Sequence, residues 1–364
     1  MADRDRAINT VTWDKQTDTV QFWAFGETAA LEKKIAQSLP TGQAWAVAET
    51  ERPIAELERV IESLAHDPGA LPEGMTFVSG TPSEDGSTIT VGVATVEGGV
   101  SLRSAALPQQ LEGVGVQFVE DEFATPTARS RPMAPIISGG QTWRGTGVGT
   151  CSQGFPVLRG QDSQANSLTA DHCTAAASEN WNWGSGSISI GKSTFQAAGD
   201  TDLELYTGAG SLSAWMLVGT NTDSDTVAPI RGYVAPVGGN NVCYNGSRSG
   251  LVCSNTLENA DVYSCVDGGF LQCYWTRWST QSAGTASSGN GDSGGPVAMF
   301  GIRESDQTIG AYGVGVISMM SNPSTTCTGD PSTTTRKCSA NNGMAPLNRW
   351  ASAQSTHNLV YTTS

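Results

Sequence analysis

The placement of the cysteines is the feature that most constrains how this chain can fold. No C-x-x-C pair occurs among them and the 364 residues include only three histidines, so the pattern favours disulfide bonds over zinc sites. Such bonds persist in oxidising compartments, which indicates an extracytoplasmic protein. All eight cysteines lie in the second part of the chain, at positions 151, 173, 243, 253, 265, 273, 327 and 338. Short loops favour three bridges, namely Cys243 with Cys253, Cys265 with Cys273, and Cys327 with Cys338.

The net charge argues against binding to nucleic acid, and the hydropathy pattern argues against a helix that spans a membrane. The net charge of −15 argues against nucleic-acid binding, because phosphate contacts need basic patches. No apolar stretch reaches the roughly 18 residues that a membrane-spanning helix needs. The first residues, Met1 to Arg6, are hydrophilic, so we expect Met1 to be a start placed after a secretion signal that has been removed. An intracellular protein is the alternative, but it conflicts with the cysteines.

Residues 1–122 carry signals for both strands and helices, which predicts a small α+β domain. β-rich runs on either side of turn residues suggest hairpins over 10–23 and 76–91. Apolar periodicity predicts one helix over 28–39 and a stronger one that starts at Pro53 and stops before Asp67.

The composition changes after this segment. Residues 123–135 contain three prolines and no periodicity, which is typical of an exposed linker, and Arg129 and Arg131 within it invite cleavage. Residues 136–364 are rich in Gly, Ser and Thr and contain short, regularly spaced strand runs, a pattern of all-β sandwiches and barrels. One helical pattern follows near the end, over 346–358.

Residues 289–297 read Gly-Asn-Gly-Asp-Ser-Gly-Gly-Pro-Val, a glycine-rich turn around Ser293. A serine hydroxyl is a poor nucleophile at neutral pH, so it needs a tight turn, a neighbouring base and amides aimed at the oxyanion. Among the histidines, only His172 follows a strand-like stretch and precedes a cysteine, Cys173. Each residue alone is more often structural than catalytic, but together they indicate a nucleophile and its base.

The stretches from Thr169 to Cys173 and from Gly291 to Pro296 together resemble the chymotrypsin-like serine peptidases. The opening Cys-Ser-Gln-Gly-Phe-Pro-Val at 151–157 resembles the secreted bacterial branch, the streptogrisin and alpha-lytic type. This resemblance covers about residues 136–364, and Ile136 resembles a mature amino terminus. It implies two six-stranded antiparallel β-barrels with a C-terminal helix, no metal and no cofactor. It also implies that the two remaining cysteines, Cys151 and Cys173, brace the histidine loop.

The resemblance further implies the roles of the site residues. Ser293 is the expected nucleophile, His172 the general base, and the amides of Gly291 and Ser293 the oxyanion hole. The family places the orienting carboxylate before an apolar, small, apolar trio, which selects Asp202. Because Glu204 occupies the small position, Asp200 remains the second candidate.

Several positions depart from the family pattern. Strand alternation around Leu203 and Leu205 predicts that Glu204 faces outward. Asp171 stands where the family has Ala or Gly, adding a carboxylate beside His172. Tyr244 stands where relatives have an arginine that pairs with the acid before the nucleophile, which leaves Arg248 as the expected substitute partner of Asp292.

The position of the substrate pocket is also implied by the resemblance. Ser287 falls at its floor, and Ser318, Met319 and Met320 form its wall. A neutral floor argues against Lys or Arg substrates, because desolvating a cation needs a buried carboxylate. We expect a non-basic, small-to-medium apolar residue before the scissile bond.

The acidic first segment resembles the pro-regions of this bacterial branch, which act as folding catalysts and inhibitors. We therefore expect a pro-region over 1–122, a processed linker over 123–135 and a peptidase over 136–364, with residues 120–127 across the cleft. The predicted protein is a secreted, monomeric serine endopeptidase made as a zymogen, which acts on peptides or proteins and is inhibited by its own pro-region. A generic accessory domain, such as a substrate-binding module, is the alternative for the first segment.

Two alternatives apply to the whole chain. A peptidase-like fold could be retained as a binding module, although no member of the triad is missing. Gly-Asp-Ser-Gly-Gly at 291–295 also satisfies the G-x-S-x-G pattern of α/β-hydrolase esterases, with His357 and either Asp306 or Asp330 completing a triad. The alternating strands and helices of that fold are absent from the sequence pattern around Ser293.

Overall fold

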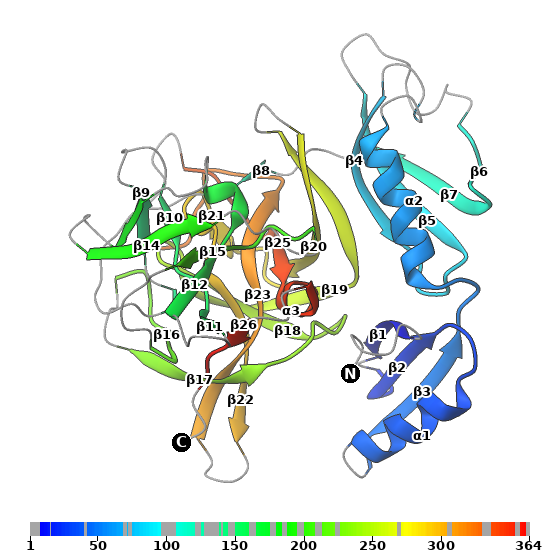
Figure 1. Ribbon diagram of the computed structural model, residues 1–364, viewed down its shortest axis with the longest axis horizontal. Coiled ribbons are helices and arrows are strands. Elements are labelled where there is room, and N and C mark those ends of the chain that lie inside the picture. Colours follow the sequence, from blue (N-terminus) through cyan, green and yellow to red (C-terminus); the bar gives the residue numbers. More distant parts are fainter. Residues whose placement is uncertain are drawn as a thin grey trace. The chain divides into compact units, whose positions relative to one another are not determined.

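The chain is mostly β-structure and divides into two compact units (Figure 1). Unit 1 comprises Met1–Ala124, Val237–Asn240 and Leu257–Cys273, and unit 2 comprises Thr125–Pro236, Asn241–Thr256 and Tyr274–Ser364. The computed structural model describes residues 8–14, 16–39, 42–67, 71, 75–95, 107–120, 125–126, 138–139, 141–144, 150–159, 165–174, 180–183, 188–194, 200–207, 213–222, 226–267, 271–303, 308–329, 336–353 and 357–361.

Unit 1 begins with a small sheet covered by a helix. Strands β1 and β2 form the predicted hairpin, and β3 adds to β2 in parallel. Helix α1 buries Leu31 and Ile35 against Ile8 and Phe22 of this sheet, as its apolar periodicity predicts. The bounds are β1 (Ile8–Asp14), β2 (Thr19–Ala24), α1 (Ala29–Ser38) and β3 (Ala44–Glu49).

A second sheet of unit 1 is covered by the stronger helix, α2. Four apolar side chains of α2 are fully or almost fully buried, including Leu57 and Ile61, and α2 packs on β4 and β5. The strand order is β19-β4-β5-β7-β6, with β4 and β5 forming the second predicted hairpin. The bounds are α2 (Ile54–His66), β4 (Met75–Pro82), β5 (Thr88–Thr95), β6 (Gln110–Leu111) and β7 (Val114–Glu120).

Strand β19, which lies next to β4 in this order, comes from the second part of the chain. β19 (Gly250–Asp267) and β20 (Leu271–Gln281) are long strands, and the stretch from Leu257 to Cys273 belongs to unit 1. There Tyr263 pairs with Gly80 and Ser264 with Ser79 of β4, and Cys265 is bonded to Cys273. Residues that the sequence assigns to the 136–364 domain thus complete the sheet of unit 1.

Unit 2 contains two larger sheets around a shared core. One has the order β10-β9-β13-β14-β15-β12-β11-β26, and the other runs β16-β17-β23-β22-β18-β19, with β25 joining β23 to β20. Their bounds are β9 (Gln141–Arg144), β10 (Thr150–Ser152), β11 (Pro156–Arg159), β12 (Ala165–Thr169), β13 (Asn180–Trp183), β14 (Ile188–Thr194), β15 (Glu204–Thr207), β16 (Trp215–Leu217), β17 (Val227–Tyr233), β18 (Asn241–Gly246), β22 (Pro296–Arg303), β23 (Thr308–Ser321), β25 (Asn341–Pro346) and β26 (His357–Leu359).

The core of unit 2 is formed by apolar side chains from both sheets. Phe155 and Leu168 of the first sheet cluster with Val316 of the second, and Trp350 of α3 closes the cluster. Helix α3 (Leu347–Ala353) is shorter than the predicted helix over 346–358, because β26 follows it and pairs with β11.

All eight cysteines are paired. The three bridges favoured by short loops are present, and the fourth joins Cys151 to Cys173, as the resemblance implies. Among the described residues, no helix is long and apolar enough to span a membrane.

Candidate active site

His172 lies between Asp202 and Ser293 in unit 2. Its Nδ1 is 2.7 Å from Asp202 Oδ2 and its Nε2 is 2.8 Å from Ser293 Oγ. The backbone N–H of His172 also donates to Asp202 Oδ1 at 2.9 Å. The carboxylate thereby fixes both the ring and the backbone of the histidine, and the ring contacts the hydroxyl.

Two short elements present the histidine and the serine. His172 belongs to the 3₁₀ turn η2 (Asp171–Cys173), which follows β12 and is tied to β10 by the Cys151–Cys173 bridge. Ser293 lies in the turn between β21 (Ser288–Gly289) and β22, and its carbonyl accepts the Ser152 N–H at 2.6 Å. A disulfide and a cross-sheet hydrogen bond thus anchor these residues.

Glycines shape the turn around Ser293. Gly291 and Gly294 have φ of +109° and +86°, conformations that side-chain-bearing residues rarely adopt. A Cβ on Gly294 would also collide with the Ser152 carbonyl and the Thr169 hydroxyl. The oxyanion role of the Gly291 and Ser293 amides stays a prediction.

Asp202 is a fully buried carboxylate whose surroundings favour its charged form. Burial alone raises its pKa, but the charge and hydrogen bond of His172, aided by the hydroxyl of Ser318, more than offset this and hold the pKa below its usual value. Ser318 Oγ donates to Asp202 Oδ2 at 2.5 Å. Asp200, the second candidate, is exposed, and its carbonyl accepts the Trp275 N–H at 2.8 Å. Asp202 is therefore the carboxylate that lies beside the imidazole.

The prediction that Glu204 faces outward is wrong. Glu204 is fully buried, because β15 lies between β14 and β12 and both faces of the strand are covered. Leu203 and Leu205 belong to the main core, and Tyr206 clusters with Trp181 and the Cys151–Cys173 bridge on the opposite face. The alternation of side chains along a strand shows which residues share a face, but it does not show whether either face is exposed to solvent.

Asp292, which precedes Ser293, is fully buried and has several partners. It accepts the Ser249 hydroxyl at 2.7 Å, the Ser249 N–H at 3.2 Å and the Gly289 N–H at 2.5 Å. Arg336 Nη2 lies 3.6 Å from Asp292 Oδ2. The sequence named Arg248 as the substitute partner and missed Arg336.

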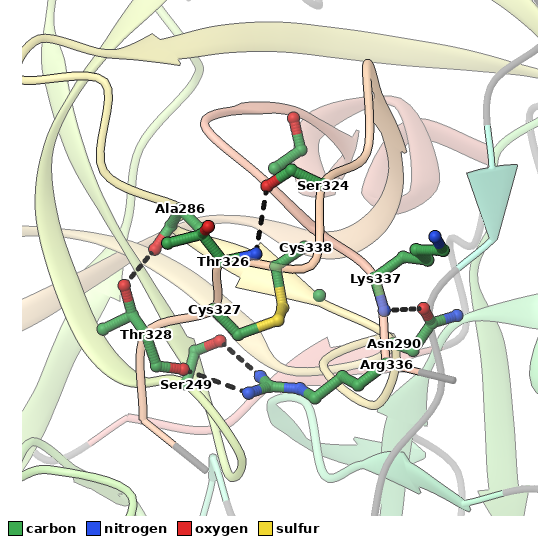
Figure 2. The surroundings of a disulfide bond; sticks show 12 residues. Ser249, Ala286, Asn290, Ser324, Thr326, Cys327, Thr328, Arg336, Lys337 and Cys338 are labelled. Carbon is green, nitrogen blue, oxygen red and sulfur yellow. Dashed lines mark hydrogen bonds between the residues drawn. A yellow bond between two sulfur atoms is a disulfide. The ribbon is translucent and has the colours of Figure 1, made fainter. Parts of the chain in front are cut away.

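Arg336 is held in the loop that the Cys327–Cys338 disulfide closes (Figure 2). Its guanidinium is buried and donates to the Ser249 hydroxyl at 2.9 Å and to the Thr328 carbonyl at 3.1 Å. β24 (Cys338–Ser339) pairs with β21, which brings this loop beside the turn that carries Ser293. The predicted bridge at Cys338 was the one signal in the sequence that could have led to Arg336.

Tyr244, which the resemblance places where an arginine is expected, is fully buried. Its hydroxyl donates to the Asn342 carbonyl and accepts from Ser279, both at 2.9 Å. Burial raises the pKa of this phenol well above its usual value, so Tyr244 contributes no charge near Asp292.

The four expected pocket residues, Ser287, Ser318, Met319 and Met320, are all fully buried. Ser287 Oγ accepts from Nδ2 of buried Asn342 at 2.8 Å, and Ser288 Oγ donates to the side-chain oxygen Oδ1 of Asn342. Asn342 was missed in the sequence, where nothing marks it. The hydrogen-bond partners described around Ser287 and Ser288 are thus neutral amides and hydroxyls.

A short strand from the expected linker region lies along β23. β8 (Thr125–Pro126) pairs antiparallel with Met319 and Met320. This is the chain segment expected across the cleft. Arg129, Arg131 and Ile136 lie outside the described residues, so the expected cleavage and amino terminus stay predictions.

The α/β-hydrolase alternative receives no support from the geometry. His357 lies in β26, where it pairs with Arg159, and the histidine at Ser293 is His172. Asp306 and Asp330 lie outside the described residues. No group of three metal-binding side chains occurs in the described part of the chain.

Comparison with known proteins finds similarity only to solved structures. No family model and no curated protein matches the chain. A glutamic-acid-specific serine protease that uses a histidine triad in substrate binding is 20% identical, with a TM-score of 0.45 over 62% of this chain and all of that one. Thermobifida fusca Protease A is 21% identical, with a TM-score of 0.44, and the match covers 63% of this chain and all of that one. Cellulomonas bogoriensis chymotrypsin is 23% identical, with a TM-score of 0.42, and the match covers 62% of this chain and 99% of that one. At these values the similarities do not assign the chain to a family.

Proposed function

We propose that this chain is a secreted serine endopeptidase made as a zymogen, whose unit 2 is built on two β-barrels with a C-terminal helix. The observation that carries the proposal is the position of the His172 ring, 2.7 Å from Asp202 and 2.8 Å from Ser293. This arrangement can activate a serine hydroxyl, because the base contacts the nucleophile and a buried carboxylate orients the base. The four disulfides support an oxidising, extracellular location.

The chemistry is acyl transfer in two stages. Ser293 Oγ attacks the peptide carbonyl while His172 Nε2 takes its proton, and the Gly291 and Ser293 amides receive the oxyanion. The imidazolium, stabilised by Asp202, then returns the proton to the leaving amine as the C–N bond breaks. Water, deprotonated by His172, hydrolyses the acyl-enzyme and regenerates the serine. Neither stage requires a metal or a cofactor.

The proposed specificity is for a non-basic residue before the scissile bond. Ser287 and Asn342 at the floor are neutral and hydrogen-bonded to each other, so a cationic side chain would lose its hydration without gaining a counter-charge. The walls formed by Met319 and Met320 favour small or medium apolar side chains. A peptide-library cleavage profile dominated by arginine would contradict this proposal.

The proposed latency rests on β8. An extended substrate needs the same edge of β23 that Thr125–Pro126 occupies, because strand addition uses the backbone groups of Met319 and Met320. We therefore propose that residues 1–122 are a pro-region which acts as an intramolecular inhibitor and folding catalyst. Processing within 123–135 would cut the chain beside Thr125–Pro126, so that this strand can then leave the edge to peptide or protein substrates.

A fluorophosphonate probe tests the proposal directly. The purified chain is incubated with the probe before and after limited proteolysis within 123–135, and the labelled residue is mapped by mass spectrometry. We expect labelling of Ser293 only after cleavage. Labelling before cleavage would contradict latency, and absence of labelling in both states would favour a binding module. The Ser293→Ala variant is the control for non-specific reaction.

A further inference from the structure

Asp171, the residue before His172, is buried and held by a tyrosine from another strand. Only 7% of Asp171 is exposed, and Tyr274 Oη of β20 donates to Asp171 Oδ2 at 2.9 Å. Asp171 Oδ1 finds no hydrogen-bond partner within the described part of the chain. Burying a carboxyl group with one oxygen that makes no hydrogen bond costs folding free energy, so the presence of Asp171 at this position needs a physical explanation.

The groups around Asp171 are mostly acidic. Burial and then the charge of Asp202 raise its pKa from 3.8 to about 6, while the Tyr274 bond and the charge of His172 act in the opposite direction. Tyr274 has its own pKa raised, first by burial and then by Asp202, Asp171 and Glu204, so its phenol stays a neutral donor. His172 is the cation-forming group in this cluster, and Asp171 is mostly ionised at neutral pH.

We propose that Asp171, oriented by Tyr274, is a positioning residue whose negative charge acts together with that of Asp202 on the His172 imidazole. This inference rests on the proposed function. Asp202 bonds the ring directly, whereas Asp171 acts through space from the preceding residue in η2. No substrate contact is assigned to Asp171.

The expected effect follows from electrostatics in a buried site. His172 becomes an imidazolium in the transition state, and a second carboxylate in a poorly solvated environment stabilises that cation. The same charge raises the pKa of His172 in the free enzyme, so the imidazole becomes a stronger base that is neutral only at higher pH. The charge of Asp171 therefore favours proton transfer to His172 at neutral pH. It lowers activity at acidic pH, where His172 is already protonated.

The first test compares pH profiles of kcat/KM for cleaved wild-type enzyme and Asp171→Asn. We expect the acid limb of the variant to move down by about one pH unit, since a nearby charge shifts a pKa by roughly that much. We expect kcat on the plateau to fall by about three- to tenfold while KM is unchanged. Asp200→Asn, which removes an exposed carboxylate from the neighbouring loop, should leave the profile as in the wild type.

A second variant tests the role of Tyr274. Tyr274→Phe removes the bond that keeps Asp171 ionised, so we expect a smaller shift in the same direction, and no further shift when it is combined with Asp171→Asn. Tyr233→Phe removes the hydroxyl of another tyrosine, which donates to the Val360 carbonyl at 2.9 Å, and is the matched control. Independent shifts for the two changes would overturn the inference.

A third measurement does not depend on activity. In the Ser293→Ala chain, NMR follows the titration of His172, which has to be distinguished from only two other histidines, His66 and His357. We expect Asp171→Asn to lower the pKa of His172. If wild-type Ser293 reacts with the probe but neither the pH profile nor the His172 titration moves, this inference fails and the proposed function stands. If wild-type Ser293 does not react, the proposed function itself fails.

Discussion

The guanidinium of Arg336 lies 3.6 Å from the carboxylate of Asp292, and both groups are almost completely buried. Ser249 bridges them, because its hydroxyl donates to Asp292 and accepts from Arg336. Asp292 directly precedes Ser293, so the charge balance of this pair bears on the conformation of the nucleophile turn. Arg336 lies in the loop that the Cys327–Cys338 disulfide closes, so this loop helps to hold the turn that carries Ser293.

Replacement of Arg336 by Met tests this relationship. Loss of one partner leaves Asp292 as an uncompensated buried charge, so we expect the free energy of unfolding to fall by about 3 kcal/mol and labelling of Ser293 to slow. Chemical denaturation and probe kinetics measure the two effects. Lys337→Met, which removes the exposed neighbouring cation, should change neither. Adding Asp292→Asn to Arg336→Met should recover part of the stability; an additive loss would count against the pairing.

The identity of the orienting carboxylate is tested with two asparagine variants. Asp202→Asn should lower kcat by about 10⁴-fold, because the amide favours the wrong imidazole tautomer while the geometry is retained. Asp200→Asn should leave kcat nearly unchanged, since the side chain of Asp200 is exposed. Steady-state kinetics on the cleaved enzyme measure both. The reverse order of effects would assign the role to Asp200.

Asp171→Asn should make the protein more stable at neutral pH. The folded state raises the pKa of Asp171 from 3.8 to about 6, so folding favours the protonated acid, and that stabilisation is lost as the pH rises through about 6. Asparagine avoids this cost, which predicts a gain of about 2–3 kcal/mol above pH 6 and almost none near pH 4. Denaturation curves across this pH range provide the measurement. Equal gains at both pH values would contradict the titration of Asp171.

Removal of residues 1–127 should prevent recovery of active enzyme. Without β4, the segment of β19 around Tyr263 loses one of its neighbouring strands, and the edge that β4 covers is exposed during folding. The yield of probe-labelled Ser293 after refolding measures the effect, with the full chain refolded in parallel and then cleaved as the control. Equal yields from the two chains would refute the role of the first segment as a folding catalyst.

Local signals in the sequence account for much of this structure. The hairpin over 10–23 and the helix beginning after Pro53 are encoded by nearby residues, and so are three of the bridges. The motifs named His172, Asp202 and Ser293, which the fold brings within hydrogen-bonding distance.

The features that sequence reasoning missed depend on distant partners. Glu204 is buried because Trp181 and a disulfide cover the second face of its sheet. Arg336 meets Asp292 because β24 pairs with β21. Likewise, the attachment of 257–273 to unit 1 depends on pairing with β4, which neither strand shows by itself.

The pairing of β19 with β4 also distinguishes the proposed cut in the chain from the release of its first segment. A cut between residues 126 and 136 divides the polypeptide, but the backbone hydrogen bonds at Tyr263 and Ser264 still join the two fragments as one sheet. Release of the first fragment then requires β4 to separate from β19. The rate of this separation depends on temperature and denaturant rather than on the protease that made the cut. If the chain is processed as proposed, this pairing predicts a delay between the cut and the release of the first fragment.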